Sequence, residues 1–192
     1  MIQIRQSTFE TNSSSAHSLI LKPGFDFMSA DDVYEELQWK LYEVEGRPGK
    51  FTLKMRIYED DASFDRYPFR VLGDFYHKLL YLYAHAPTRV YPPTEKREWH
   101  RYQKQYYKVT NYIKKYLPWL DGVDWSYADE KPSSEAIGFN GALKKLHLTW
   151  YDYLFDRNVI VVCDGDEYQV WRGMKKLGLV DMKTIKEEVV YD

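Results

Sequence analysis

The sequence predicts an α+β fold in which helices pack on a mixed sheet and long amphipathic helices occupy the middle of the chain. Strand-like patterns lie near both ends, and residues 158–163 form the continuous apolar run that is typical of a strand covered on both faces. A chain of 192 residues that is 44% hydrophobic can bury one sizeable core. We therefore expect a single domain over residues 1–192, with residues 66–120 as an alternative helical lobe.

Apolar patterns in the first third of the chain predict three strands and one helix. The strands span residues 2–5, 17–21 and 51–58. The first and the last of them alternate apolar and polar side chains, which is the pattern of a half-buried strand. Ser29 is a favourable N-cap and is followed by apolar residues at helical spacing, so a helix is predicted over residues 30–45.

Four further helices and three further strands are predicted in the rest of the chain. The helices span residues 69–86, 94–117, 142–155 and 167–177. The strands lie near residues 123–127, 158–163 and 185–191, the second as a central strand and the third as an edge strand. Pro118 blocks continuation of the second helix, and Gly178 is a typical C-terminal cap for the last one.

Composition and charge exclude several classes of protein. Basic and acidic side chains number 27 and 29, so the net charge of -2 gives no overall attraction to nucleic acid or membranes. No apolar run approaches the about 20 residues of a membrane-spanning helix, and the first residues lack the features of a signal peptide. Cys163 is the only cysteine, which excludes an internal disulfide. We expect no membrane partner and a cytoplasmic location.

A polar segment over residues 9–18 is the first candidate site. Its small polar side chains are suited to an anionic or nucleotide ligand, and these ligand-binding candidates are Thr11, Asn12, Ser13 and Ser14. If Ser15 and His17 share a strand face, the imidazole can act as a general base on the hydroxyl, which makes both catalytic candidates. Turn chemistry favours the alternative, a hairpin or bulge in which these side chains bond to nearby backbone groups.

The same segment carries a family resemblance. Residues 9–18, which read F-E-T-N-S-S-S-A-H-S, resemble the opening of an uncharacterised family of small proteins from bacteriophages and their bacterial hosts, especially Gram-positive ones. Residues 161–168, with Trp171 after them, are similar to a C-terminal segment of the same proteins. The resemblance brings no established activity with it. It implies a viral or mobile-element origin, and therefore the cytoplasm of a host cell as the location.

The long helix predicted over residues 94–117 is the second candidate. At about 100° per residue, its aromatic and aliphatic side chains fall on one face and most of its basic side chains on the other. The helix holds seven basic and two acidic residues, a net charge of +5, so the rest of the chain carries -7. Like charges four residues apart repel each other, and the basic face has no interleaved acidic residues to offset this repulsion. We expect a group outside the helix to neutralise that face, the alternative being a solvated surface.

This basic face defines a set of partner-binding candidates. They are Arg97, Arg101, Lys104, Lys108 and Lys115, with Tyr107 and Tyr112 beside them as aromatic anchors. Three groups are suited to neutralise the lysines and arginines: the acidic helix predicted over residues 30–45, the phosphates of a nucleic acid, or the acidic surface of a protein.

A pair of aspartates, Asp164 and Asp166, forms a third and weaker candidate. They follow the predicted central strand, and carboxylates at the end of a buried strand can hold a divalent cation. Turn and helix-cap chemistry explains the same residue types without a metal and is the favoured interpretation. The five histidines show no metal-binding spacing. We therefore predict no metal site, and the sequence names no cofactor.

Two hypotheses of different classes follow for the function. The first is a phage-encoded accessory protein that binds a host or phage protein, or a nucleoprotein complex, through the basic, tyrosine-rich helix, with an anti-defence inhibitor as one concrete form. The second is a small nucleotide-binding or phosphoester-processing enzyme that uses residues 11–18. The sequence leaves open the partner, the oligomeric state, and whether residues 11–18 and the Asp164 turn are adjacent.

Overall fold

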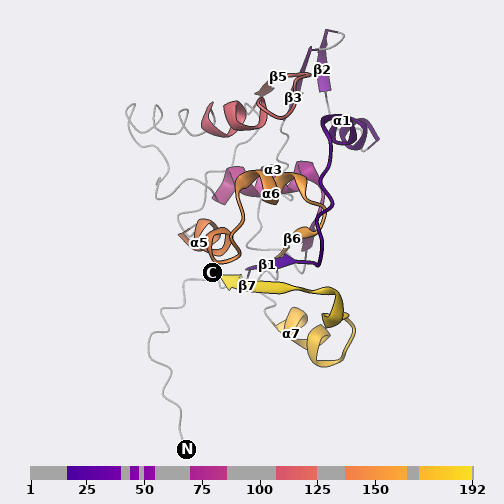
Figure 1. Cartoon of the computed structure of the whole chain (residues 1–192), viewed down its shortest axis with the longest axis vertical. Helices are drawn as coiled ribbons and strands as arrows, with labels where there is room; N and C mark the ends of the chain where they lie inside the picture. Colours follow the sequence, from indigo (N-terminus) through magenta and orange to yellow (C-terminus); the bar gives the residue numbers. More distant parts are fainter. Residues whose placement is uncertain are drawn as a thin grey trace, which may run out of the picture.

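The computed structural model describes residues 17–39, 44–47, 50–54, 70–85, 107–124, 137–163 and 169–191. This part of the chain confirms the α+β class, because helices pack against two sheets (Figure 1). The main sheet has four strands in the order β4-β6-β1-β7, and neighbouring strands are antiparallel. The second sheet has three strands in the order β2-β3-β5 and combines an antiparallel with a parallel pair.

The main sheet contains three strands that the sequence predicts and one, β4, that it does not. Its strands are β1 (His17–Leu21), β4 (Arg70–Leu72), β6 (Val159–Cys163) and β7 (Glu187–Tyr191). The prediction of a strand over 17–21 is confirmed, and so is the inner position of the strand predicted over 158–163. The C-terminal strand is the edge next to β1. The strand predicted over residues 2–5 lies outside the described residues.

The first helix ends earlier than the sequence predicts. Helix α1 (Ala30–Trp39) begins at a capping box, in which Ser29 Oγ accepts from the Asp32 N–H and the Asp32 carboxylate accepts from the Ser29 N–H. The predicted extension to residue 45 is wrong, because strand β2 (Val44–Arg47) pairs with β3 (Lys50–Lys54) there. The spacing of residues 41 and 44 fits a helix, but pairing of Val44 with Leu53 in the sheet overrides it.

The helix predicted over 69–86 is also shorter at its start. Residues 70–72 form β4 and pair with β6, so the prediction of helix at these positions is wrong. Helix α3 (Phe75–His85) begins after Asp74, whose carboxylate accepts from the His77 N–H at 2.9 Å. The spacing of Leu72 fits the helix, but Leu72 belongs to strand β4, and its side chain is buried there.

The single helix predicted over 142–155 is wrong, because the chain forms two helices. Helix α5 (Ile137–Lys145) and helix α6 (Trp150–Phe155) are separated by a turn in which His147 has a φ of 56°. This left-handed conformation ends a helix. A capping box between Thr149 and Asp152 then starts α6.

The long helix predicted over 94–117 is described only in its C-terminal part. Residues 107–113 are helical, and the following turn tightens as the Tyr116 N–H donates to the Ile113 carbonyl at 2.9 Å. The helix ends before Pro118, as predicted. Its first part, residues 94–106, lies outside the described residues, so the full length stays a prediction. Strand β5 (Leu120–Asp124) begins before the predicted position near 123–127 and runs parallel to β3.

The C-terminal region covers the second face of the main sheet. Helix α7 (Gln169–Lys176) ends at Gly178, whose φ of 68° and backbone hydrogen bonds form the predicted C-terminal cap. A short 3-10 helix, η1 (Met182–Thr184), leads into β7. Val180 and Ile185 pack with Ile20 and Val162 on this face.

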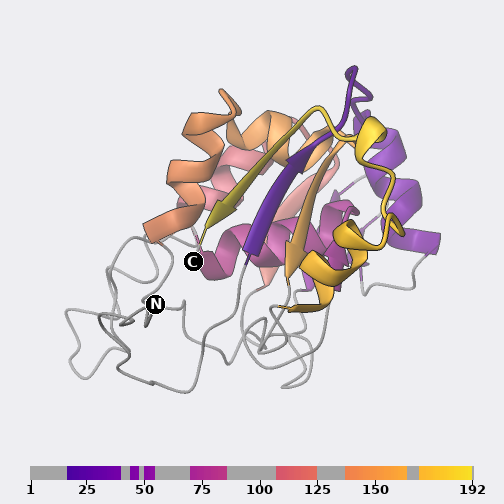
Figure 2. The same cartoon turned by 90° about the horizontal axis from the view of Figure 1, so that it is seen from below.

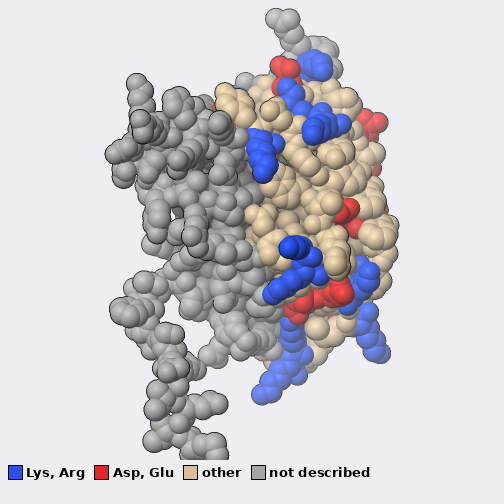
Figure 3. All heavy atoms as spheres, turned by 60° about the vertical axis from the view of Figure 1, so that its left-hand side comes forward, with Lys and Arg blue, Asp and Glu red and all other residues tan. Residues whose placement is uncertain are grey.

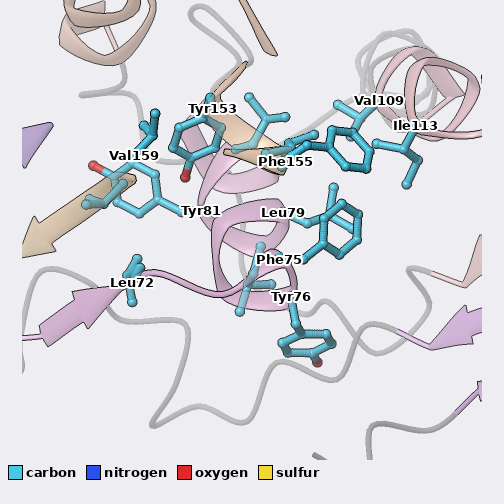
Figure 4. Packing of buried hydrophobic residues seen from close by; sticks show 14 of the residues in the cluster. Leu72, Phe75, Tyr76, Leu79, Tyr81, Val109, Ile113, Tyr153, Phe155 and Val159 are labelled. Atoms are coloured by element: carbon cyan, nitrogen blue, oxygen red, sulfur yellow. The ribbon is translucent and has the colours of Figure 1, made fainter. Parts of the chain in front are cut away.

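Helix α3 lies at the centre of the core. Figure 2 shows α3, α5 and α6 on one side of the main sheet and α7 on the other. Phe75 and Leu79 of α3 point towards Phe155 of α6 and towards Val109 and Ile113 (Figure 4). The same cluster of buried side chains includes residues from both sheets, so α3 holds the helical layer against the strands.

Candidate functional site

A row of polar side chains crosses one end of the main sheet. Arg70, Cys163 and His17 lie directly opposite one another on β4, β6 and β1. Directly opposite residues point to the same face of a sheet, which here is the face that buries Leu19 against the core. The chain therefore enters β1 and leaves β6 at the same end. The two polar segments that the sequence singles out, residues 11–16 and 164–168, are attached to this end.

His17 is buried within this row. Its side chain is 4% exposed, and its Nδ1 shares a hydrogen bond with the hydroxyl of Tyr81 on α3. The two ring centroids are 5.6 Å apart. A histidine held in this way has one ring nitrogen occupied by a structural partner. Ser18, the next residue, is also buried, on the opposite face of β1.

The remaining candidates of the polar segment lie outside the described residues. These are the ligand-binding candidates Thr11, Asn12, Ser13 and Ser14 and the catalytic candidate Ser15. Asp164 and Asp166 are also outside the described ranges. Within those ranges, no group of three or more His, Cys, Asp and Glu side chains is arranged to hold a metal ion.

Two residues in the polar row or in contact with it were not singled out from the sequence. Arg70 and Tyr81 come from β4 and α3, more than fifty residues from His17 along the chain. No local motif marks either residue, because their position depends on strand pairing and on the packing of α3.

A buried lysine lies deeper in the core. The ammonium of Lys78 on α3 donates to the backbone carbonyls of Asp156 at 2.9 Å and Val159 at 3.4 Å. Burial lowers the pKa of Lys78 to about 8, and the nearby carboxylates of Glu36 and Asp156 oppose this shift. The side chain has no exposed surface. Lys78 therefore joins the end of α6 to the start of β6 and has no route to a ligand in this conformation.

Asp156 completes this buried polar group. Its Oδ1 accepts from the Asp26 N–H at 3.1 Å and the Asn158 N–H at 2.9 Å, which fixes two loops. Its Oδ2 is buried without a hydrogen-bond partner in the described part of the chain. The positive charge of Lys78 stabilises this carboxylate through the interior, where electrostatic interactions are stronger than in water.

On the outside of the molecule, six aromatic side chains from three segments form an aromatic cluster. Its members are Phe25 and Phe27 between β1 and α1, Tyr112 and Tyr116 in the 107–117 segment, and Trp150 and Tyr151 on α6. Successive ring centroids are between 4.6 and 5.6 Å apart. Tyr116 and Tyr151 also pack on the buried ring of Phe155, so the cluster is anchored in the core.

The outer rings of the aromatic cluster are open to solvent. Phe25 is 72% exposed, Phe27 is 40% exposed and Tyr116 is 38% exposed. Neither phenylalanine has a polar atom in its side chain that water could solvate. Adjacent exposed rings on one surface are typical of an interaction site, whereas a single exposed apolar side chain is ordinary.

Two of the partner-binding candidates, Lys108 and Tyr112, lie in or beside the cluster, and a third, Lys115, belongs to the same segment of the chain. The ammonium of Lys108 lies 5.2 Å from the centre of the Trp150 ring, which is cation–π geometry. Lys115 is exposed on the same segment. Tyr112 is half-buried between Tyr116 and Trp150, so it supports the cluster more than it projects from it.

The hydroxyl of Tyr112 stays protonated. Partial burial and a hydrogen bond with Tyr116 raise the pKa of Tyr112 to about 12. Tyr112 therefore contributes no tyrosinate charge in the physiological range.

Tyr107 is the most exposed of the predicted aromatic anchors, with 65% of its surface open to solvent. The basic candidates Arg97, Arg101 and Lys104 lie outside the described residues. On the described part of the face in Figure 3, Lys and Arg side chains are separated by uncharged surface and by Asp and Glu. The continuous basic stripe thus stays a prediction.

Comparison of the chain with protein-family models, with curated proteins and with solved structures finds no match. The structure also contains, within its described ranges, no helix long and apolar enough to cross a membrane.

Proposed function

We propose that this protein acts by binding a macromolecule through the aromatic cluster together with Tyr107, Lys108 and Lys115. The expected partner is a host or phage protein, alone or within a nucleoprotein complex. The observation that carries this proposal is the group of exposed rings, above all Phe25, which is 72% exposed.

The composition of this surface fits recognition of a protein. Tyrosine and tryptophan are enriched among the residues that dominate binding energy at interfaces, because each combines a large apolar area with a polar atom. Lys108 supplies a charge at the border of the rings, and Lys115 is a second exposed charge on the same segment, and such charged groups guide association and select the partner.

An anti-defence inhibitor is one concrete form of such a binding protein. A small protein of phage origin that binds a host immune complex would cover the surface on which that complex recognises its target. The support for this form is the resemblance of residues 9–18 to bacteriophage proteins.

The experiment is affinity capture of host-lysate proteins by the tagged chain, with nuclease treatment and washes at two salt concentrations. The variant Lys108→Glu/Lys115→Glu should lose the captured protein while its melting temperature stays unchanged. Lys183→Glu/Lys186→Glu, which reverses two exposed lysines near β7, is the matched control and should retain it. Equal capture by both variants would remove Lys108 and Lys115 from the interface.

A second candidate function is a small nucleotide-binding or phosphoester-processing enzyme. It is favoured by the row of Arg70, Cys163 and His17 at the sheet end to which residues 11–16 and 164–168 are attached. In this hypothesis the serines contact phosphate or act as nucleophile and His17 is the base, with Asp164 and Asp166 as metal ligands.

The enzyme hypothesis is tested by thermal stabilisation with nucleoside mono-, di- and triphosphates, with and without Mg²⁺. Ser13→Ala/Ser14→Ala is the test variant, because replacement of the buried His17 would disturb the contact with Tyr81. Stabilisation that disappears in this variant favours the enzyme. No stabilisation of the native chain by any of these nucleotides contradicts it.

A further inference from the structure

The aromatic cluster has opposite charges on its two sides. Asp26, Asp31 and Asp32 lie beside Phe25 and Phe27, and Arg157 compensates only part of their charge. On the other side, the 107–117 segment presents the lysines next to the tyrosine rings.

The acidic side is accessible to a partner. The side chains of Asp26 and Asp32 are 57% and 42% exposed, and Arg157 lies 3.2 Å from one and 3.5 Å from the other. Asp31 is exposed as well. Arg157 thus pairs with two carboxylates, and Asp31 adds a third exposed carboxylate in the same part of the chain, so the carboxylates of residues 26–32 outnumber the one guanidinium paired with them.

The basic side carries two exposed ammonium groups. Lys108 and Lys115 are seven residues apart, which places them on nearly the same face of a helix. Lys114 is also exposed, but its ammonium donates to the backbone carbonyl of Asp121 and is not part of this pair.

A surface with an aromatic centre and opposite charges on two sides is complementary to itself. In a contact between two copies with twofold symmetry, each side of the patch meets the opposite side of the other copy. The acidic side of one copy then faces the basic side of its partner twice, while the exposed phenylalanine and tyrosine rings cover one another.

We propose that two copies of this chain associate through their aromatic clusters in an antiparallel, twofold-symmetric dimer. This inference goes beyond the proposed function and shares only the surface with it. A dimer of this kind covers the rings until a macromolecular partner displaces one copy, so partner binding and self-association exclude each other.

Charge favours a second copy over a nucleic acid as the occupant. Phosphates would be attracted to Lys108 and Lys115 but repelled by the carboxylates near Phe25, which outnumber the one guanidinium paired with them. Proteins that bind single strands combine aromatic platforms with a uniformly positive groove, which this surface lacks in its described part.

The test begins with sedimentation equilibrium of the purified full chain over about a hundredfold range of concentration, because the fraction of dimer rises with protein concentration. The native chain is expected to change from monomer to dimer over this range. Phe25→Ala should shift the equilibrium towards monomer without lowering the melting temperature. A native chain that is monomeric throughout would overturn the proposal.

Two charge-reversal variants make the test specific. The basic-side variant is Lys108→Glu/Lys115→Glu, and the acidic-side variant is Asp26→Lys/Asp31→Lys. Each alone brings like charges together and should be monomeric at concentrations where the native chain is a dimer. Mixed in equal amounts they should form a heterodimer, because both contacts become attractive again.

Lys183→Glu/Lys186→Glu should dimerise like the native chain. Dimers that persist in both single-side variants, or a mixture that stays monomeric although circular dichroism shows both proteins folded, would overturn the antiparallel arrangement. If the native chain is strictly monomeric but still captures a partner from lysate, the dimer proposal is wrong and the proposed function stands.

Discussion

The polar row at the sheet end and the aromatic cluster both bring together side chains from separate segments, but their exposure differs. His17 is 4% exposed and its ring is bonded to Tyr81, whereas Phe25 is 72% exposed. The buried contact satisfies a polar group within the fold. The ring of Phe25 stays mostly in solvent in one copy, whereas Phe27 and Tyr116 are each partly buried by the fold. The difference supports the proposal that the interior contacts stabilise the fold and that the aromatic cluster binds a partner.

The largest effect on stability is expected from the buried lysine. Lys78→Met leaves the carbonyls of Asp156 and Val159 without their donor and the Asp156 carboxylate without its nearby positive charge. We expect the free energy of unfolding to fall by about 3–5 kcal/mol, measured by urea denaturation. Lys176→Met, at an exposed lysine, should change it by less than about 0.5 kcal/mol. Equal effects of the two substitutions would contradict the structural role of Lys78.

The same lysine gives stability a defined pH dependence. Because the pKa of Lys78 is about 8 in the folded chain and 10.5 ordinarily, the folded state binds fewer protons than the unfolded state between these values. The lowered pKa of Lys78 reduces the free energy of unfolding. This reduction has its full size below pH 8 and disappears as the pH rises towards 10.5.

Relative to Lys78→Met, the native chain should therefore gain about 1–3 kcal/mol of unfolding free energy from pH 8 to 10.5. Unfolding free energies measured for both proteins across this range give the comparison. A difference that stays constant, or that shrinks with rising pH, would show that Lys78 remains charged in the folded chain.

A smaller loss of stability is expected at the sheet end. Tyr81→Phe removes the hydroxyl that contacts His17 and leaves a buried ring nitrogen without that partner. The free energy of unfolding should decrease by about 1–3 kcal/mol in thermal or urea unfolding. Tyr107→Phe, at a tyrosine that is 65% exposed, is the matched control and should change it by less than about 0.5 kcal/mol. If the free energy of unfolding of Tyr81→Phe equals that of the native chain, the contact between His17 and Tyr81 does not stabilise the fold.

The smallest effect on stability is expected in the aromatic cluster. Phe25→Ala removes a ring that is mostly in solvent and stacks on Phe27, so the unfolding free energy should change by less than about 0.5 kcal/mol. Affinity for the captured partner should fall about tenfold or more, as expected for an aromatic anchor, in a titration by surface plasmon resonance. Unchanged affinity would exclude Phe25 from the interface.

Much of the main sheet was predictable from the sequence, because its inner strands contain the apolar runs 19–21 and 159–163. Strand β1 is buried along its whole length and β6 at every residue except the partly buried Ile160, and Gly178 marks the end of α7 through its positive φ. The errors at residues 44–47 and 70–72 occur where short segments have helical spacing but pair with strands elsewhere in the chain. Local spacing carries no information on such pairing.

The candidate site was predictable only in part. His17 belongs to a conspicuous polar segment, and Lys108 and Tyr112 lie on a helix with a clear basic side. Phe25 and Tyr151 could not be predicted as parts of the same surface, because the aromatic cluster forms only when α6 packs between the 22–28 segment and residues 107–117.

The most direct test measures partner affinity and unfolding free energy together for Phe25→Ala and Tyr81→Phe. We expect Phe25→Ala to lose affinity at native stability, whereas Tyr81→Phe should lose stability and, where it is still folded, bind the captured partner as the native chain does. The central claim would be contradicted if Phe25→Ala kept full affinity, or if Tyr81→Phe alone abolished binding in the folded state.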